Sequence, residues 1–496
     1  MIKQSDMKRS LLFLITLLTV SCANSVENNK YHIVFDVSNA DMGYLTGEVN
    51  QTISGDDKTS EVTAVANLGY KFVSWSDGVK SLTRSDESFD SSTTLTAIFD
   101  YDVLEMPILK IETVNRTPIT SKEEYLTATA TSFNSEHSFA DLSLGIRGRG
   151  NYSWSGTEKK SYRIKFDKKI NIFNQGLGRA KSWTLLAVHA DKSMLRNHAV
   201  FDFAKRLGTL PFVSSSSFVE LYLNGKYDGV YEVCDQIQVN EHRVDIDDSG
   251  SEPDIGYLVE LDKNASEDVI YLNNGDTFEV KSDYVNQGQL DYITDYLNTC
   301  YNMIRSGRRE FVDQYMDIPS IIDSYIVEEY FKNLDVGWGS FYFTKPKGDK
   351  LYFGPVWDFD LCSGNAEDDR NNSNFKSYKY TYVGSPSFQY AMQQSQWFTQ
   401  LRKTSWFFDE VKTRWFEIVD KIPLMIDEVR HQNNTYYNSF NRNFERWDIF
   451  SKKINREPRE VLSIKSFQGQ VDYLIDWLNN RKEWLSGYFN GENTDL

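Results

Sequence analysis

The 496-residue chain is poor in the residues that most often build metal and nucleophile sites, with four cysteines and six histidines. The histidines show no ligand spacing, and neither H-E-x-x-H nor G-x-S-x-G occurs, which excludes the common zinc-protease and serine-hydrolase motifs. Cys234, Cys300 and Cys362 are an odd, widely spaced set without a C-x-x-C pair. They predict buried free thiols, not a zinc site or a disulfide framework.

Positive charge is also scarce, with 54 Lys and Arg against 71 Asp and Glu and a net charge of −17. Nucleic acid is bound through Lys and Arg that release counterions from its phosphates, so nucleic acid is not the expected partner. Any phosphate-bearing ligand must meet a local basic cluster or a metal. The chain is 40% hydrophobic and 14% aromatic, which is enough for a large core and more than one domain.

The apolar run at residues 11–18 is too short to cross a membrane. Basic residues precede it, and small residues and then Cys22 follow it, which is the arrangement of a secretory signal. The end of the run resembles a relaxed bacterial lipoprotein cleavage box. We therefore expect a lipoprotein signal peptide at residues 1–22, a lipid on Cys22 and an envelope protein anchored to the membrane, either periplasmic or surface-exposed. Ordinary secretion with an incidental Cys22 is the alternative.

Alternating apolar residues at 31–37, 61–66 and 94–99, punctuated by glycines, predict a small β-rich domain at residues 30–101. The segment Gly69-Tyr70-Lys71-Phe72-Val73-Ser74-Trp75-Ser76-Asp77-Gly78 resembles the β-grasp-type Listeria/Bacteroides surface repeat. Such modules usually serve as stalks or adhesive spacers, so no chemistry is expected here. The alternative is an additional sheet packed on the main domain.

Residues 102–496 are expected to form an α+β domain, because strand-like segments dominate to about residue 262 and helix-like periodicity dominates from about residue 286. The segments 406–415 and 471–478 carry apolar residues three and four positions apart, which predicts one buried face on each helix.

Three carboxylates lie on two neighbouring elements of this domain. Asp335 ends an apolar, helix-like stretch, and Asp358 and Asp360 belong to Val356-Trp357-Asp358-Phe359-Asp360. Convergent carboxylates suit a divalent metal and the deprotonation of a hydroxyl. The structural alternative is that they cap turns and loops. Their apolar neighbours favour function, because an unpaired carboxylate is costly in a partly buried setting. A two-carboxylate glycoside hydrolase is physically possible, but it leaves the basic segment described next without a purpose.

A basic, glycine-rich segment at residues 146–153 leads into Lys159-Lys160-Ser161-Tyr162-Arg163-Ile164-Lys165-Phe166. Glycines let backbone amides approach a phosphate, and strand alternation separates Lys160 and its even-numbered partners from Ser161, Arg163 and Lys165. One of the two sets would point into a cleft. Taken alone, the segment favours a solvated basic hairpin.

Two further segments follow the basic one. Residues 191–197 predict a turn capped by Asp191 or Ser193 and a helix that carries Arg196. For Asp191 the capping role is the expected one. Residues 219–231 predict a β-hairpin with an Asn-Gly turn.

From about residue 104 to about residue 489 the chain resembles the CotH kinase family, the spore-coat-type atypical protein kinases. The resemblance is carried by five ordered motifs: R-G-N from Arg149, K-K-S-Y-R-I-K-F from Lys159, D-x-S-x-x-R-N from Asp191, L-N-G-x-Y-x-G-V-Y from Leu223, and W-D-F-D from Trp357 with Gly364 after it. It implies a kinase-like core that binds ATP and Mg²⁺ and transfers the γ-phosphoryl group to protein Ser or Thr hydroxyls.

The resemblance also implies roles for particular residues. Asp335 matches the catalytic carboxylate and Asp358 the metal ligand, and Asp360 is a second ligand or a partner of the first. Phosphoryl transfer independently needs one carboxylate for the acceptor hydroxyl, another for the metal, and cations for the phosphates. The candidate cations are, in order of preference, Lys160, Arg149 and Arg196.

The expected function is therefore an extracytoplasmic atypical protein kinase that acts on envelope or secreted proteins. The alternative is a catalytically inactive surface binding or scaffold lipoprotein. One departure keeps the alternative open, because Asp235 stands near a position where the family more often has glutamate, and a shorter acid would weaken a pair with the phosphate-binding lysine. The polar insert at residues 365–372 is expected to be a mobile loop and not a metal site.

Overall fold

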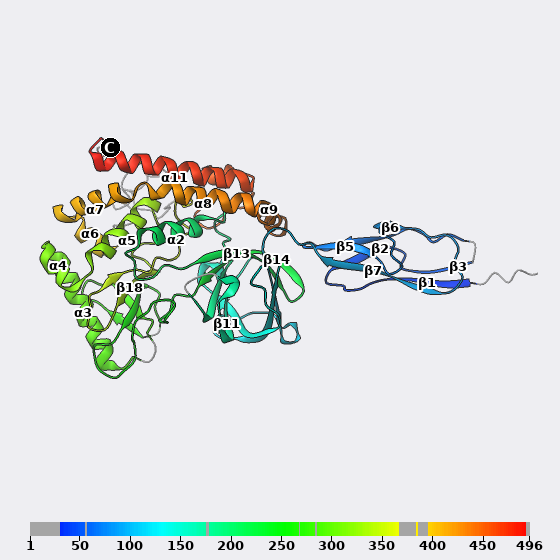
Figure 1. Cartoon of the computed structure of the whole chain (residues 1–496), viewed down its shortest axis with the longest axis horizontal. Coiled ribbons are helices and arrows are strands. Elements are labelled where there is room, and N and C mark those ends of the chain that lie inside the picture. The colour runs from blue at the N-terminus through cyan, green and yellow to red at the C-terminus, as the bar shows by residue number, and fades with distance from the viewer. Residues whose placement is uncertain are drawn as a thin grey trace, which may run out of the picture. The chain divides into compact units, whose positions relative to one another are not determined.

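The computed structural model describes residues 30–54, 57–174, 178–266, 268–282, 285–366, 383–384 and 395–492. The predicted signal peptide with Cys22 and residues 367–372 of the polar insert lie outside these residues. The chain divides into two compact units, Met1–Asp100 and Tyr101–Leu496. The class is α+β, as predicted, with a β-rich N-terminal part and a helical C-terminal part (Figure 1).

The first unit is built from two small sheets whose alternating apolar residues meet in one core. The first sheet has the order β3 (Asn50–Ser54), β1 (Lys30–Val37), β7 (Thr93–Tyr101), β5 (Tyr70–Trp75). The second has the order β2 (Gly43–Gly47), β4 (Val62–Ala66), β6 (Thr83–Arg84). Trp75, which is fully buried, packs edge-on against Phe35 at the centre of this core.

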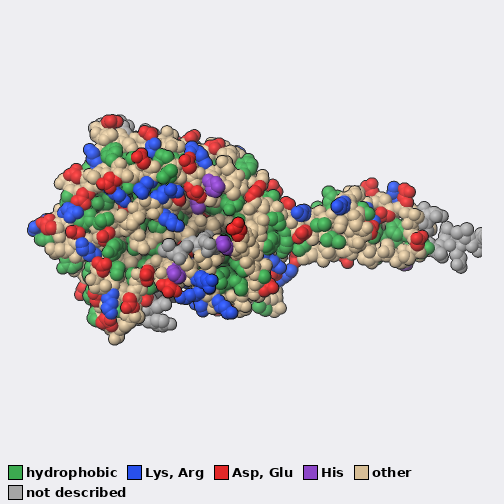
Figure 2. All heavy atoms as spheres, viewed as in Figure 1, with side chains coloured by type: hydrophobic (Ala, Val, Ile, Leu, Met, Phe, Trp, Pro, Cys, Tyr) green, Lys and Arg blue, Asp and Glu red, His purple; other side chains and the backbone are tan. Residues whose placement is uncertain are grey.

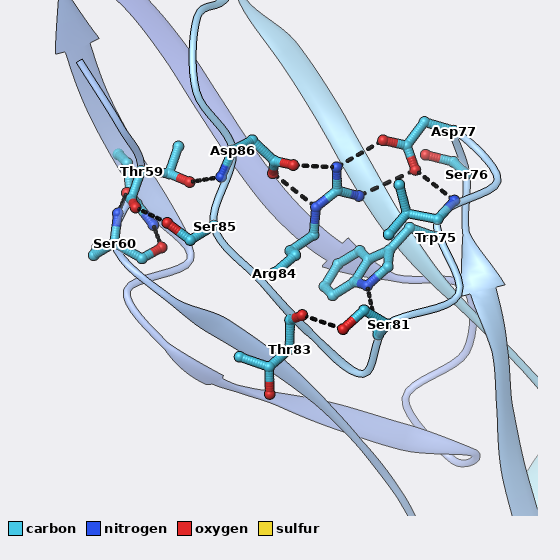
Figure 3. A network of polar contacts seen from close by, with 12 residues as sticks. Thr59, Ser60, Trp75, Ser76, Asp77, Ser81, Thr83, Arg84, Ser85 and Asp86 are labelled. Carbon is cyan, nitrogen blue, oxygen red and sulfur yellow. Dashed lines mark hydrogen bonds and ion pairs between the residues drawn. The ribbon is translucent and has the colours of Figure 1, made fainter.

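The side chain of Arg84 covers one end of that core. The guanidinium of Arg84 lies over the Trp75 ring, 5.0 Å from its centre, and reaches two carboxylates (Figure 3). Arg84 donates to Asp77 at 2.6 and 3.1 Å and to Asp86 at 2.8 and 2.9 Å. Two bidentate pairs on a stacked arginine fix the loop before β6 and the loop after it.

The second unit begins with a closed barrel of seven strands in the order β10-β11-β12-β14-β13-β8-β9. The strands are β8 (Ile108–Thr113), β9 (Leu126–Phe133), β10 (Leu142–Arg149), β11 (Ser161–Ile170), β12 (Ala180–Leu186), β13 (Ser216–Leu223) and β14 (Lys226–Asp235). Alternate residues such as Ile146, Ile164 and Trp183 fill its interior. The predicted hairpin is β13–β14, and Asn224 and Gly225 both have positive φ, as a tight Asn-Gly turn requires.

A second sheet follows, with the order β16 (Val269–Tyr271), β17 (Thr277–Val280), β15 (Tyr257–Leu261), β18 (Phe341–Lys345), β19 (Tyr352–Phe353). The longer helices are α2 (Arg196–Leu207), α3 (Gln287–Arg305), α5 (Ile318–Phe331), α7 (Ser405–Ile418), α8 (Lys421–Thr435), α9 (Tyr437–Arg446) and α11 (Phe467–Asn490). Shorter ones are α1 (Tyr152–Ser155), α4 (Arg309–Tyr315), α6 (Gln396–Leu401) and α10 (Arg459–Ser463).

The helices pack into one large core around α5 (Figure 1). Every residue of α5 except Pro319 is buried. The predicted apolar faces on α7 and α11 are confirmed, because Phe407, Val411, Leu474 and Leu478 are fully buried. No helix within the described residues is both long enough and apolar enough to span a bilayer. The three cysteines that the structure describes are free and buried, as predicted.

Candidate active site

A cavity of about 1010 Å³ lies in the second unit, between the barrel and the second sheet. Strands β10, β11 and β12 contribute to it from the barrel, β15, β17 and β18 contribute from the sheet, and the turns that carry the two acidic segments lie between them. Its volume is at the upper end of the range for ligand pockets, which is large enough for a nucleotide together with part of a second substrate.

The structure brings Asp335, Asp358 and Asp360 into this one cavity. Asp335 follows α5, which ends at Lys332 in a left-handed conformation with φ of 51°. The side-chain oxygen of Asn333 accepts the amide N–H of Asp335 at 3.1 Å, and the Asp335 carbonyl accepts from the Trp338 amide at 2.9 Å. These bonds hold Asp335 in the tight turn between α5 and β18.

Asp358 is presented differently, on a strained backbone between two buried aromatic residues. Its φ is 68°, a left-handed value that costs a non-glycine residue about 1–3 kcal/mol. Trp357 and Phe359 are buried on either side, and the Phe359 amide donates to the side-chain oxygen of Asn197 on α2 at 2.8 Å. The Ser340 hydroxyl reaches a carboxylate oxygen of Asp358 at 3.4 Å. The surrounding fold therefore turns the Asp358 side chain into the cavity.

The carboxylates perturb one another electrostatically. Burial raises the pKa of Asp358, and the negative charge of Asp335 raises it further, whereas Arg149 and Ser340 act in the opposite direction. The Asp358 side chain is exposed to water inside the cavity. Protein atoms nevertheless surround it on the other sides, so the loss of bulk water raises its pKa. Burial raises the pKa of Asp360 well above its ordinary value, and Asp358 and Asp335 add to the shift. A bound cation would relieve this repulsion.

The donor set fits Mg²⁺ in the form in which kinases hold it. Mg²⁺ is usually bound through one or two carboxylates together with water and substrate phosphates, not by an all-protein cage. Within the described residues no three His, Cys, Asp or Glu side chains surround a common metal position. The residues present would therefore fit a metal shared with a phosphate ligand, for which Asp358 and Asp360 would be the protein's oxygen donors.

Of the three predicted cations, only Arg149 lines the cavity. Its guanidinium carbon lies 5.4 Å from the centre of the Trp357 ring, and the guanidinium nitrogens make no hydrogen bond to another described residue. Burial lowers its pKa, and the charge of Asp358 opposes the shift. Its donors are therefore available to an anion next to the carboxylates.

Lys160 and Arg196 lie elsewhere. The ammonium of Lys160 donates to the carbonyls of Trp154 and Thr157, so it holds the loop between β10 and β11. The fully buried Arg196 donates to the carbonyl of Cys362 at 3.1 Å and forms an ion pair with Asp191. It thereby fixes the backbone that follows the W-D-F-D segment, and the binding of phosphates by Lys160 and Arg196 stays a prediction.

Strand alternation explains why Lys160 is absent from the cavity. Tyr162, Ile164 and Phe166, which share its phase, point into the barrel, whereas Ser161, Arg163 and Lys165 line the cavity. The sequence pattern indicated these two sets but did not say which one faced the cleft. Arg163, Lys165 and Asn197 are cavity residues to which the sequence interpretation assigned no role.

Two acidic residues outside the cavity have structural partners. Asp191 accepts from the amides of Ser193 and Arg196, both at 2.9 Å, in the turn before α2, although the N-cap position of that helix is Leu195. Asp235 is buried and forms an ion pair at 2.7 Å with Arg243. The acid that departs from the family pattern therefore has a partner of its own, which is not a cavity lysine.

Comparison with known proteins agrees with this architecture. Residues 33–103 match the model of the divergent InlB B-repeat domain, in agreement with the predicted N-terminal surface repeat. A search of curated proteins finds no significant match. Residues 146–485, more than half of the chain, match the model described as CotH kinase protein. This stretch contains the cavity, both acidic segments and Arg149, and the chain belongs to the CotH kinase protein family.

Proposed function

We propose that the protein is an ATP- and Mg²⁺-dependent protein kinase that phosphorylates Ser or Thr hydroxyls of envelope or secreted proteins. Membership of the CotH kinase protein family supports kinase activity in general. The observation that carries the finer proposal is the arrangement of Asp335, Asp358 and Asp360 opposite the available guanidinium of Arg149 in one large cavity. The predicted signal peptide supports the extracytoplasmic location, with a lipid on Cys22 as the anchor.

The chemistry divides among these residues by position. Asp335 orients the acceptor hydroxyl and takes its proton as the oxygen–phosphorus bond forms and the bond to the ADP oxygen breaks. Asp358 and Asp360 would hold Mg²⁺, which when bound with ATP neutralises phosphate charge. Arg149 binds a phosphate oxygen and offsets the negative charge that the three carboxylates bring to the cavity.

Two other residues act by positioning this set. Asn197 accepts the Phe359 amide and keeps the backbone on which Asp358 sits in its left-handed conformation. Arg196 holds the carbonyl of Cys362, two residues beyond Asp360. Neither needs to touch a substrate, because both fix the W-D-F-D segment relative to α2.

The test is calorimetric titration of ATP into the protein with and without Mg²⁺, followed by phosphate transfer to a mixture of envelope proteins. Wild type should bind ATP in a Mg²⁺-dependent manner. Asp335→Ala should keep that binding and lose transfer, Asp358→Ala should lose the Mg²⁺ dependence, and the exposed Asp409→Ala on α7 should behave as wild type. If folded wild type does not bind ATP under either condition, the kinase proposal fails and a surface scaffold is the better model.

A further inference from the structure

We propose that the barrel side of the cavity is a docking surface for an extended, acidic acceptor segment, and we call Arg163, Lys165, Lys169 and Lys181 its basic wall. The inference rests on the proposed kinase function and deepens it by naming the class of acceptor. The residues come from the neighbouring strands β11 and β12. In Figure 2, Lys and Arg side chains gather over the part of the unit where Figure 1 labels β11.

Charge is segregated between the two sides of the cavity. Among the described residues between 147 and 240, the cavity lining includes six Lys and Arg side chains and no Asp or Glu. Among those described between 260 and 360, it includes seven Asp and Glu side chains and one lysine. Although the chain has a net charge of −17, the cations of the cavity lie together on one wall, opposite the carboxylates that would bind the metal and orient the acceptor hydroxyl. Such a wall attracts an anionic ligand and orients it.

The spacing along β11 matches an extended peptide. Ser161 pairs with Arg149, which lies beside Asp358, and Arg163 and Lys165 are two and four residues further along the same face. A strand rises about 3.3 Å per residue, so these cations lie roughly 7 and 13 Å from the Ser161–Arg149 pair. An extended peptide places every second side chain on one side with the same period. Acidic side chains at alternate positions would therefore meet successive cations.

From Tyr162 to Lys165 the backbone of β11 cannot supply this recognition, because β10 and β12 already pair with it on both sides. Side chains must do so, and two of them are available. The side chains of Lys165 and Lys181 are exposed, and their ammonium groups make no ion pair or hydrogen bond to another described residue. Lys169 pairs with Glu241 at 2.8 Å, but both side chains are half exposed, and such pairs contribute little and exchange readily.

The distance along the strand favours a peptide over the nucleotide as the ligand of these cations. Arg149 stands next to Asp358, where the phosphates of ATP would meet the metal ligands. Lys165 lies about 13 Å beyond that level, so it is placed for the second substrate. The cavity volume of about 1010 Å³ leaves room for both.

The test uses the full chain and three fluorescein-labelled peptides with one central Ser: Glu at alternate positions, the same composition with the Glu residues consecutive, and Lys in place of Glu. Anisotropy measures their binding, and Mg²⁺-ATP binding and transfer are measured in parallel. The variants are Lys165→Glu/Lys181→Glu and the milder Lys165→Gln/Lys181→Gln. The control is Lys168→Glu, an exposed residue of β11 that does not line the cavity.

We expect the alternating acidic peptide to bind best and the Lys peptide worst. The double charge reversal should weaken binding of the acidic peptide by about tenfold or more, because two attractive contacts become repulsive. In Lys165→Gln/Lys181→Gln the affinity for the acidic peptide should fall several-fold, and in Lys168→Glu it should stay within about twofold of wild type. Binding of Mg²⁺-ATP should not change in any of these variants. Raising the salt concentration should weaken binding of the acidic peptide to wild type.

Four results would overturn the inference. The first is equal binding of the acidic and basic peptides by wild type, and the second is that Lys168→Glu loses as much affinity for the acidic peptide as the Lys165/Lys181 variants do. The third is loss of Mg²⁺-ATP binding in the Lys165/Lys181 variants, and the fourth is that these variants lose as much affinity for phosphatidylglycerol vesicles as for the acidic peptide. The third would assign the basic wall to the nucleotide, and the fourth to a membrane surface. Selective binding of the acidic peptide by a folded wild type that does not bind ATP with or without Mg²⁺ would support the docking surface and defeat the proposed kinase function alone.

Discussion

Glu328 makes the stability of the second unit depend on pH in a direction opposite to that of most carboxylates. The residue lies on α5 and is only 3% exposed. One of its carboxyl oxygens has no hydrogen-bond partner among the described residues. Its pKa is raised from 4.5 to about 8, mainly by burial, while a hydrogen bond with Asn333 opposes the rise and the charge of Asp335 adds to it. The folded state therefore holds a proton that the unfolded chain releases.

The sign and size of the effect follow from proton linkage. Between pH 4.5 and about 8 the folded state binds more protons than the unfolded state, so stability falls as pH rises through this window. Each pH unit within it costs about 1.4 kcal/mol. The full cost above pH 8 is roughly 5 kcal/mol, and the cost at pH 7 is roughly 3 kcal/mol.

Glu328→Gln keeps the size of the side chain and cannot titrate. The difference in unfolding free energy between the variant and wild type should rise by about 1.4 kcal/mol for each pH unit between pH 5 and 8. Any constant cost of the new amide cancels in that slope. The assay is urea unfolding followed by tryptophan fluorescence at four pH values, with the exposed Glu445→Gln on α9 as the control. Parallel curves for wild type and Glu328→Gln would refute the reasoning.

Three further outcomes are expected. Arg196→Met should lower the unfolding free energy by about 3–5 kcal/mol, measured by urea denaturation, because it leaves the carboxylate of Asp191 buried without its cation. Asp360→Asn should raise the unfolding temperature of the metal-free protein by roughly 2 °C, measured by calorimetry, and should weaken Mg²⁺-ATP binding, because it removes one of three mutually repelling carboxylates. Arg84→Ala should lower the unfolding free energy of the first unit by about 2 kcal/mol, measured by thermal denaturation, because it removes both ion pairs. ATP binding should not change, because these ion pairs lie outside the unit that holds the cavity.

Several features of the fold were readable from local patterns. Period-two alternation predicted the strands of the first unit and the two faces of β11, and three- and four-residue spacing predicted the buried faces of α7 and α11. The Asn-Gly turn predicted the β13–β14 hairpin. Strand β18 was not predicted, because all five of its residues are buried and a strand covered on both faces carries no alternation.

The sequence by itself determined which residues could take part in the site, because convergent carboxylates and a basic glycine-rich segment have recognisable compositions. Tertiary structure decided which of them meet. Lys160 and Arg149 both carry positive charge and lie close together in the sequence, but closure of the barrel places the end of β10 beside the W-D-F-D turn and leaves Lys160 bonded to its own loop. The guanidinium of Arg196 pairs with Asp191 and donates to the Cys362 carbonyl, which lies 166 positions further along the chain. Spacing along the chain is a local property, whereas access to a cavity depends on how distant strands close around it.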